Sequence, residues 1–226
     1  MNNVLFLCYS TPNYEPLTSR FLKSLCDIGV TRIDHLLETV PKNIASTSGF
    51  QSSIWYYSVF KKIQHLVNRL KHYRDTPNDI KFFIFSDCDI WFPKLNVNKW
   101  EQMLQSCSTK AIYFMREHQS DDVNSGFFIM PKDHIDVVIP FFETVLDTMN
   151  KLSPEEMPFG DQSVINNIKQ TIPFGFGFIE NKYVVWGTCI WDKQNTLLHH
   201  AVGTGTITGK LKQMERIRTQ LQIKKR

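Results

Sequence analysis

The stretch FFIFSDCDIWF, residues 82 to 92, joins the most strand-like run of the chain to a pair of acidic residues. A continuous apolar run of this kind is typical of a parallel strand that is buried on both faces of a sheet. Residues i and i+2 of an extended chain point to the same side, so Asp87 and Asp89 can face one point while Cys88 faces away. Two close carboxylates repel each other unless a cation lies between them, so the stretch indicates a site for Mg²⁺ or Mn²⁺. In the alternative interpretation, one aspartate caps the following turn and the other is solvated.

The flanking segments alternate between short strand-like runs and longer helix-like patterns, which indicates the α/β fold class. Further strands are expected at residues 4–9, 33–40, 111–115, 126–130, 174–178 and 183–186. Helices are expected at residues 17–28, 50–74, 133–149 and 161–168, with a last helix from residue 209. No repeat or low-complexity linker divides the sequence, so a single domain over residues 1–226 is expected.

The composition is that of a folded globular protein, because 42% of the 226 residues are hydrophobic and 21% are charged. Disorder, collagen and coiled coils are therefore excluded. The net charge of +4 is uneven, since the segment from Gly209 to Arg226 holds seven basic residues and one acidic residue. The net charge of that segment is +6, so the rest of the chain has a net charge of −2. A basic tail on an acidic body does not predict a nucleic-acid partner.

The basic C-terminal segment has apolar residues at helical spacing, namely Ile207, Leu211, Met214, Ile217 and Leu221. An amphipathic helix of this kind packs against its own domain by default. The alternative is weak contact with a membrane surface through its basic residues.

Cysteine usage and the apolar runs predict a cytoplasmic location, which is the host cytoplasm if the protein is viral. The five cysteines form no C-x-x-C pair, so reduced thiols are expected in place of a zinc knuckle or a disulfide framework. The N-terminus lacks the charged region of a signal peptide. No apolar run approaches the roughly 20 residues that a membrane-spanning helix needs.

Two further polar motifs border apolar segments. The triplet Asn124-Ser125-Gly126 combines a glycine, which permits close backbone approach, with side chains suited to sugar hydroxyls. An ordinary turn into a strand is the alternative for this triplet. Asp161 and Gln162 begin a predicted helix, where Asp161 is either the N-cap or, with Gln162, a contact to a sugar.

A glycine-rich stretch, HHAVGTGTITGK at residues 199 to 210, leads into the last predicted helix. Backbone N–H groups at such a helix start favour an anion, and Lys210 would add a cation beside a diphosphate. The glycine spacing and the short remaining chain do not fit a dinucleotide-binding unit. An isolated histidine pair is more often structural than metal-binding.

In their order along the chain, these motifs resemble those of the GT-A glycosyltransferases. The motifs are Asp87-Cys88-Asp89, Asn124-Ser125-Gly126, Asp161-Gln162, and His200-x-x-Gly203 with Lys210. The chain looks most similar to nucleotide-diphospho-sugar transferases that share features with glycogenin-like and bacterial galactosyltransferase families. The resemblance covers nearly the whole chain and implies one Rossmann-like GT-A domain, with a mostly parallel central sheet flanked by helices and with residues 209–226 as its terminal helix.

The resemblance also implies roles for the matching residues. Asp87, Asp89 and His200 would bind Mn²⁺ or Mg²⁺ against the donor diphosphate, whereas His199 points the other way. Thr11 to Tyr14 would receive the nucleoside, Asn124 and Ser125 would contact the donor sugar or the acceptor, and Asp161 and Gln162 would lie near the anomeric carbon. Gly203 and Lys210 would contact the diphosphate, although related families place the lysine closer to the glycine.

The implied activity is the transfer of a hexosyl or pentosyl group from a nucleotide-diphosphate sugar to a hydroxyl of a glycan, glycoprotein or glycolipid. The cation would stabilise the charge that develops on the leaving nucleoside diphosphate. Similar families with an Asp-Gln pair are mostly retaining, so retention of configuration is expected. One rival is a phosphohydrolase of the haloacid-dehalogenase type, whose D-x-D normally lies in the first strand. The other is a non-catalytic nucleotide-sugar or glycan-binding module of the same fold.

Overall fold

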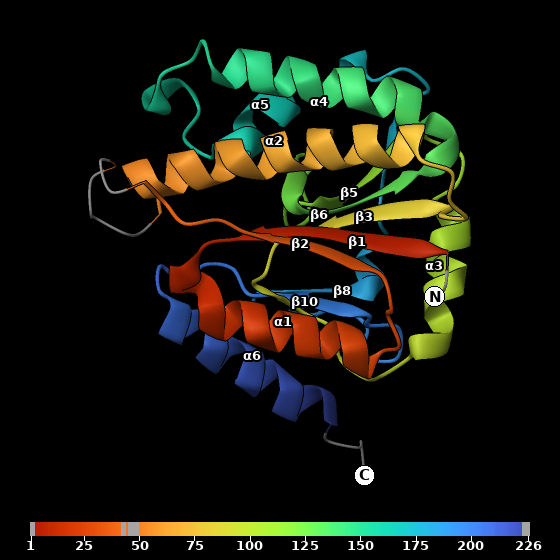
Figure 1. The fold of residues 1–226 in the computed structure, drawn as a ribbon. Coiled ribbons are helices and arrows are strands. Elements are labelled where there is room, and N and C mark those ends of the chain that lie inside the picture. The colour runs from red at the N-terminus through yellow and green to blue at the C-terminus, as the bar shows by residue number, and fades with distance from the viewer. Residues whose placement is uncertain (1–2, 42–43, 45–49, 223–226) are drawn as a thin grey trace.

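The computed structural model describes residues 3–41, 44 and 50–222 and is built around a six-stranded sheet (Figure 1). The strand order is β2-β1-β3-β6-β5-β7. Three neighbouring pairs are parallel, β1 with β2, β1 with β3 and β5 with β7, and β6 runs antiparallel to both β3 and β5. The bounds are β1 Val4–Ser10, β2 Ile33–Leu37, β3 Phe82–Ser86, β5 Ile112–Arg116, β6 Val123–Pro131 and β7 Phe176–Phe178. The α/β class and the mostly parallel central sheet are thus confirmed.

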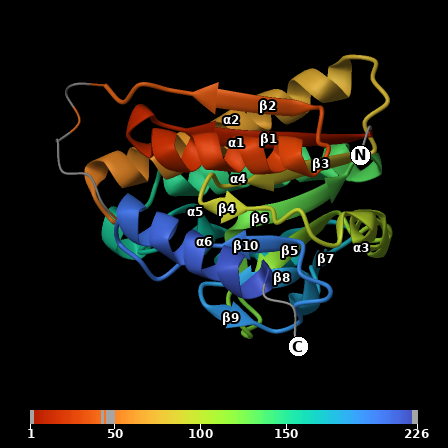
Figure 2. The ribbon, with the colours of Figure 1, turned by 90° about the horizontal axis from the view of Figure 1, so that it is seen from below.

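Helices cover both faces of this sheet (Figure 1). On one face lie α2 Ser53–Asp75, α4 Ile135–Met149 and α5 Asp161–Ile168. The other face carries α1 Glu15–Asp27, α3 Trp100–Ser106 and a second sheet of order β4-β10-β8-β9. The strands of that sheet are β4 Ile90–Trp91, β8 Val184–Trp186, β9 Cys189–Ile190 and β10 Leu198–His200. Figure 2 shows α6, Ile207–Gln222, beside α1 below this second sheet.

Two hydrophobic cores follow from the alternation of side chains along the central strands. Leu5 and Leu7 of β1 pack with α2 and α4, whereas Phe6 and Cys8 of the same strand pack toward α1, α3 and the second sheet. Every residue of β1 is buried, as the continuous apolar run predicts. Because β1 and β3 are parallel neighbours, their carboxyl-terminal ends lie at the same edge of the sheet, where Thr11 follows β1 and Asp87 follows β3.

The structure excludes two local interpretations that the sequence left open. Residues 124 to 126 are not a turn into a strand, because β6 begins at Val123 and pairs Asn124 with Met115. A register shift after Phe114 allows β5 to extend that far. Asp161 is not an N-cap, since Gly160 takes that position with a φ of 56° and Asp161 is the first helical residue. The side chains of both segments are therefore free to face a common site.

The C-terminal helix packs on the domain through its apolar stripe. Met214 contacts a cluster with Leu17 of α1, and Ile217 contacts a cluster with Val185 of β8. Both helix side chains are fully buried. The helix thus packs against its own domain, as expected by default. Among the described residues, no helix is long and apolar enough to cross a membrane.

Replacing Ile217 with alanine should lower the free energy of unfolding by about 2–4 kcal/mol, because the change leaves a cavity beneath α6. Chemical denaturation of the purified protein measures this. The exposed Lys212 of the same helix provides the control, since Lys212→Ala should change stability by less than about 0.5 kcal/mol. Equal effects of the two changes would contradict the packing of α6.

Candidate active site

A cavity of about 140 Å³ opens at the carboxyl ends of β1 and β3. Its walls come from the ends of these strands, from the segment after β1, from α2 and from the start of α6. The lining residues are Tyr9, Ser10, Thr11, Asn13, Tyr14, Ile54, Trp55, Ser58, Val59, Lys62, Asp87, Cys88, Asp89 and Lys210. Five of the residues singled out in the sequence, Thr11, Tyr14, Asp87, Asp89 and Lys210, thus share one cavity.

Asp87, Asp89 and His200 converge beside this cavity although their positions span more than half of the chain. The backbone N–H of Asp87 donates to Gly126 O at 2.7 Å, which anchors the segment after β3 to β6. Antiparallel pairing of β10 with β4 places His200 opposite Ile90, next to Asp89. One ligand atom from each of the three side chains lies within 4.8 Å of the other two.

The donor atoms of these three residues fit a hard divalent cation. The His200 Nε2 and Asp89 Oδ1 atoms are 3.3 Å apart, close to the separation of about 3 Å between adjacent ligands of an octahedral ion. Asp89 Oδ1 is buried and has no hydrogen-bond partner among the described residues, a cost that a bound cation would remove. Two carboxylates and one imidazole leave further positions for substrate oxygens.

Gly126 is required for this convergence. A Cβ atom at this position would lie 2.7 Å from His200 Cε1, 2.9 Å from Asn124 Oδ1 and 3.1 Å from Asp87 Oδ2. The backbone of β6 therefore serves as a wall against which the ligands pack. The sequence interpretation gave this glycine a role in approaching a ligand, and in the structure it is the protein's own side chains that approach.

Lys62 of α2 was missed by the sequence analysis. Its Nζ lies 2.8 Å from Asp161 Oδ2 and 3.5 Å from Asp87 Oδ1, and the lysine is buried. The available signal was a lysine within the apolar stripe of the helix, next to Ile63 and three residues after Val59. A charged residue at such a position needs a buried counter-ion, because it cannot reach bulk water.

Lys210 supplies a second cation from the start of α6. Its Nζ pairs with Asp89 Oδ2, so Lys210 lies in the cavity despite its distance from Gly203 in the sequence. Gly203 is exposed, has a φ of 72° and is not among the residues that line the cavity. His199 is fully buried and its Nε2 contacts Gly187 O at 2.9 Å, pointing away from Asp89 as its alternation with His200 requires.

Asn124 and Gln162 belong to one hydrogen-bonded network with Glu117. Asn124 Nδ2 donates to Glu117 Oε2 at 2.8 Å and to Gln162 Oε1 at 3.0 Å. Gln162 Nε2 donates to the same Glu117 oxygen at 2.9 Å, and the N–H of Ser125 donates to Gln162 Oε1 at 3.3 Å. The two polar motifs thus meet across β6 and α5. Glu117 was missed, because nothing distinguishes it from its acidic neighbours in the loop after β5.

The charges of the site are mutually dependent. Burial raises the pKa of Asp87 to about 6, an effect that Lys62 opposes and that nearby Asp89 and Asp161 reinforce. Burial would also raise the pKa of Asp89, but Lys210 and His200 hold it well below its usual range. Burial would lower the pKa of Lys62, yet attraction to Asp161 and Asp87 keeps it above its ordinary value. The lysines therefore stay charged and hold the carboxylates in place.

No protein-family model and no curated protein matches the sequence, whereas its structure resembles solved glycosyltransferases. A glycosyltransferase involved in glycosylation of the major capsid of PBCV-1 is 16% identical, with a TM-score of 0.66 over 94% of this chain and 98% of that one. The galactosyltransferase LgtC, solved with donor and acceptor sugar analogs, is 13% identical, with a TM-score of 0.52 over 97% of each chain. GlyE of Streptococcus pneumoniae is 12% identical, with a TM-score of 0.55 over 93% of this chain and 60% of that one.

Replacing Gly126 with alanine should separate His200 from Asp87 and lower stability by about 1–3 kcal/mol, because the added methyl group overlaps both side chains. Denaturation curves of wild type and variant measure the loss. Gly205→Ala is the matched control, since a Cβ there meets nothing within 4 Å. A Gly126→Ala protein as stable as the control would contradict the close approach.

Proposed function

The chain has the GT-A glycosyltransferase fold, and from this premise we propose that it is a metal-dependent glycosyltransferase. It moves a hexosyl or pentosyl group from a nucleotide-diphosphate sugar to an acceptor hydroxyl of a glycan, glycoprotein or glycolipid. The observation that carries the proposal is the meeting of Asp87, Asp89 and His200 beside a cavity at the carboxyl ends of the central strands. In open α/β sheets this is the end at which ligands bind.

Asp87, Asp89 and His200 would hold Mn²⁺ or Mg²⁺, which when bound supplies Lewis-acid stabilisation of the leaving diphosphate. Lys210 lies at the cavity wall, where its ammonium group can pass from Asp89 to a phosphate oxygen. Thr11 and Tyr14 line the part of the cavity contributed by the segment after β1, and we assign that part to the nucleoside.

Asp161 and Gln162 are assigned to the donor sugar. The Asp161 carboxylate is held by Lys62, and Gln162 is held by Asn124 and Glu117, so the position of each side chain is defined, although neither is among the residues that line the cavity. Fixed polar groups of this kind orient a bound sugar without reorganisation during the reaction. Retention of anomeric configuration remains part of the proposal and rests on this Asp-Gln pair.

We assign the acceptor to the aromatic cluster of Trp55, Phe50 and Phe159 beside the cavity. Trp55 lines the cavity, and its ring lies 4.9 Å from that of Phe50, which in turn is 6.2 Å from that of Phe159. Phe50 and Phe159 are each 55% exposed, which is uncommon for side chains of this size. Exposed apolar side chains beside a cavity are typical of binding surfaces, and aromatic faces suit a sugar ring.

A non-catalytic nucleotide-sugar or glycan-binding module is the second candidate. The ion pairs of Lys62 with Asp161 and of Lys210 with Asp89 favour it, because they offset the charge of these two acids without a metal ion. Transfer activity separates the two candidates, since binding without transfer or hydrolysis over a broad acceptor panel would support the module.

Mn²⁺ together with the correct donor should stabilise the protein by about 2.7 kcal/mol at one hundred times the dissociation constant. A thermal-shift panel of UDP-, GDP- and dTDP-sugars, with and without Mn²⁺, identifies the donor. Asp89→Ala should abolish the Mn²⁺-dependent part of the shift. The proposal of a metal-dependent transferase fails if no donor gives a response that depends on Mn²⁺.

Replacing Lys62 with methionine should reduce transfer at least about tenfold, because the change leaves the Asp161 and Asp87 carboxylates buried without their cation. Steady-state kinetics with the identified donor measure the loss. Lys61→Met is the matched control, since the Lys61 Nζ donates to Gln64 and lies outside the cavity lining. Equal transfer rates for the two variants would contradict a role of Lys62 in the transfer reaction.

A further inference from the structure

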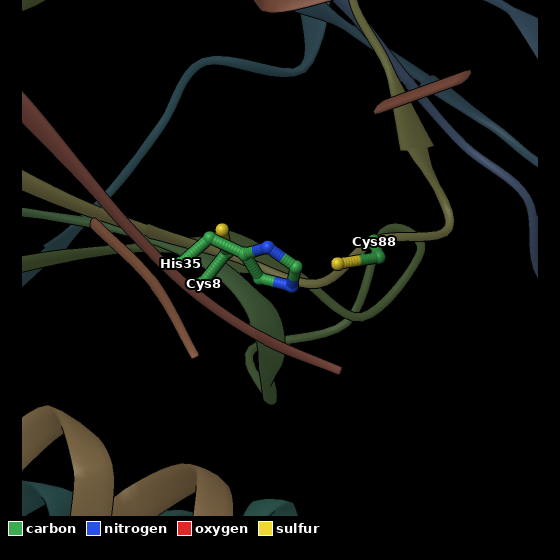
Figure 3. A group of neighbouring side chains, drawn as sticks. All are labelled: Cys8, His35 and Cys88. Carbon is green, nitrogen blue, oxygen red and sulfur yellow. The ribbon is translucent and has the colours of Figure 1, made fainter. Parts of the chain in front are cut away.

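A second group of potential metal ligands lies on the α1 side of the sheet, apart from the acidic site. Figure 3 shows Cys8, His35 and Cys88, which come from β1, β2 and the segment after β3. Cys8 and His35 are opposite each other in the parallel register of β1 and β2, so their side chains share one face. One ligand atom from each of the three residues lies within 4.8 Å of the other two.

The environment of the two sulfur atoms is suited to a cation. Cys8 is fully buried and Cys88 is 5% exposed. Each thiol donates a long hydrogen bond to a carbonyl, Cys8 Sγ to Asp34 O at 3.9 Å and Cys88 Sγ to Tyr9 O at 3.6 Å, and the two thiols also interact with each other. Binding of a metal would therefore cost the thiols little in lost hydrogen bonding. Two thiols and an imidazole favour a softer ion than the oxygen-rich group of Asp87 and Asp89 does.

The imidazole of His35 is already oriented by the protein. Its Nε2 lies 2.7 Å from Ser10 Oγ, and Ser10 is 4% exposed. Histidines that bind metals commonly have their second ring nitrogen held by such a partner, which fixes the ring and its tautomer. With Nε2 engaged by Ser10, Nδ1 is the ring nitrogen left for a metal.

We propose that Cys8, His35 and Cys88 form a Zn²⁺ site that is separate from the Asp87-Asp89-His200 group. Three protein ligands with sulfur and nitrogen donors suit a tetrahedral ion whose fourth position is taken by water. On binding, the two thiols lose their protons to solvent and coordinate as thiolates. Ser10 and Cys88 also line the cavity, which gives the ion a path of entry.

An ion bound at the zinc site would also restrain the neighbouring Asp87-Asp89-His200 group. Cys88 lies between Asp87 and Asp89, so an ion bound to it would tie this segment to β1 and β2. The zinc site would then fix the backbone that presents the two acids. This inference stands on the Cys-His-Cys geometry and does not depend on the proposed transfer reaction.

Co²⁺ is the probe, because a thiolate bound to Co²⁺ gives a charge-transfer absorption in the near ultraviolet that oxygen and nitrogen ligands do not give. Titration of the fully reduced full-length protein should produce this band with one Co²⁺ per chain, and one equivalent of Zn²⁺ should remove it. The acidic site contains no sulfur and is silent in this band. A reduced wild-type protein that shows no band overturns the proposal without any variant.

Single substitutions assign the ligands. Cys88→Ser and His35→Gln should each abolish the band or weaken Co²⁺ binding, and Ser10→Ala should weaken it by about 10-fold to 100-fold. Cys26→Ser and Cys189→Ser are matched controls at exposed cysteines and should leave the titration unchanged. An undiminished band with unchanged Co²⁺ affinity in Cys88→Ser, or a lost band in Cys26→Ser, would overturn the assignment.

Discussion

The site is organised by the need to neutralise three acids in one partly closed space. Asp89 and Asp161 are 8% and 2% exposed, and Asp87 lies between them near Lys62. Carboxylates that are removed from water are costly unless each has a cation. Lys62 of α2 pairs with both Asp161 and Asp87, and Lys210 of α6 pairs with Asp89, so the two lysines connect helices on opposite faces of the sheet to the segment after β3.

This constraint explains why distant parts of the chain meet at one point. The second sheet places His200 beside Asp89, and the packing of α6 on α1 and β8 brings Lys210 to the same carboxylate. On the other face of the central sheet, α2 and α5 bring Lys62 and Asp161 together. Gly126 leaves the space in which these groups approach β6. The two lysines offset two of the three carboxylate charges, so a bound divalent cation would enter a site that is still net negative.

The sequence predicted the parts of the site that depend on local pattern. An apolar run followed by acids at i and i+2 predicted both the buried strand β3 and the shared direction of Asp87 and Asp89. Alternation likewise separated His200 from His199. The sequence left a turn open at residues 124 to 126, because the shift in register after Phe114 depends on how β5 and β6 pair and is not visible in either strand alone. Lys62 and Glu117 were missed because their roles depend on partners far along the chain.

The account depends most on the claim that Asp87, Asp89 and His200 together hold a divalent cation. Electron paramagnetic resonance of free Mn²⁺ during titration of the protein measures this directly, without assuming a donor or an acceptor. The account predicts one bound Mn²⁺ per chain in the wild type, with loss of that binding in both Asp89→Asn and His200→Ala. Mn²⁺ binding that is equally tight in all three proteins would contradict it.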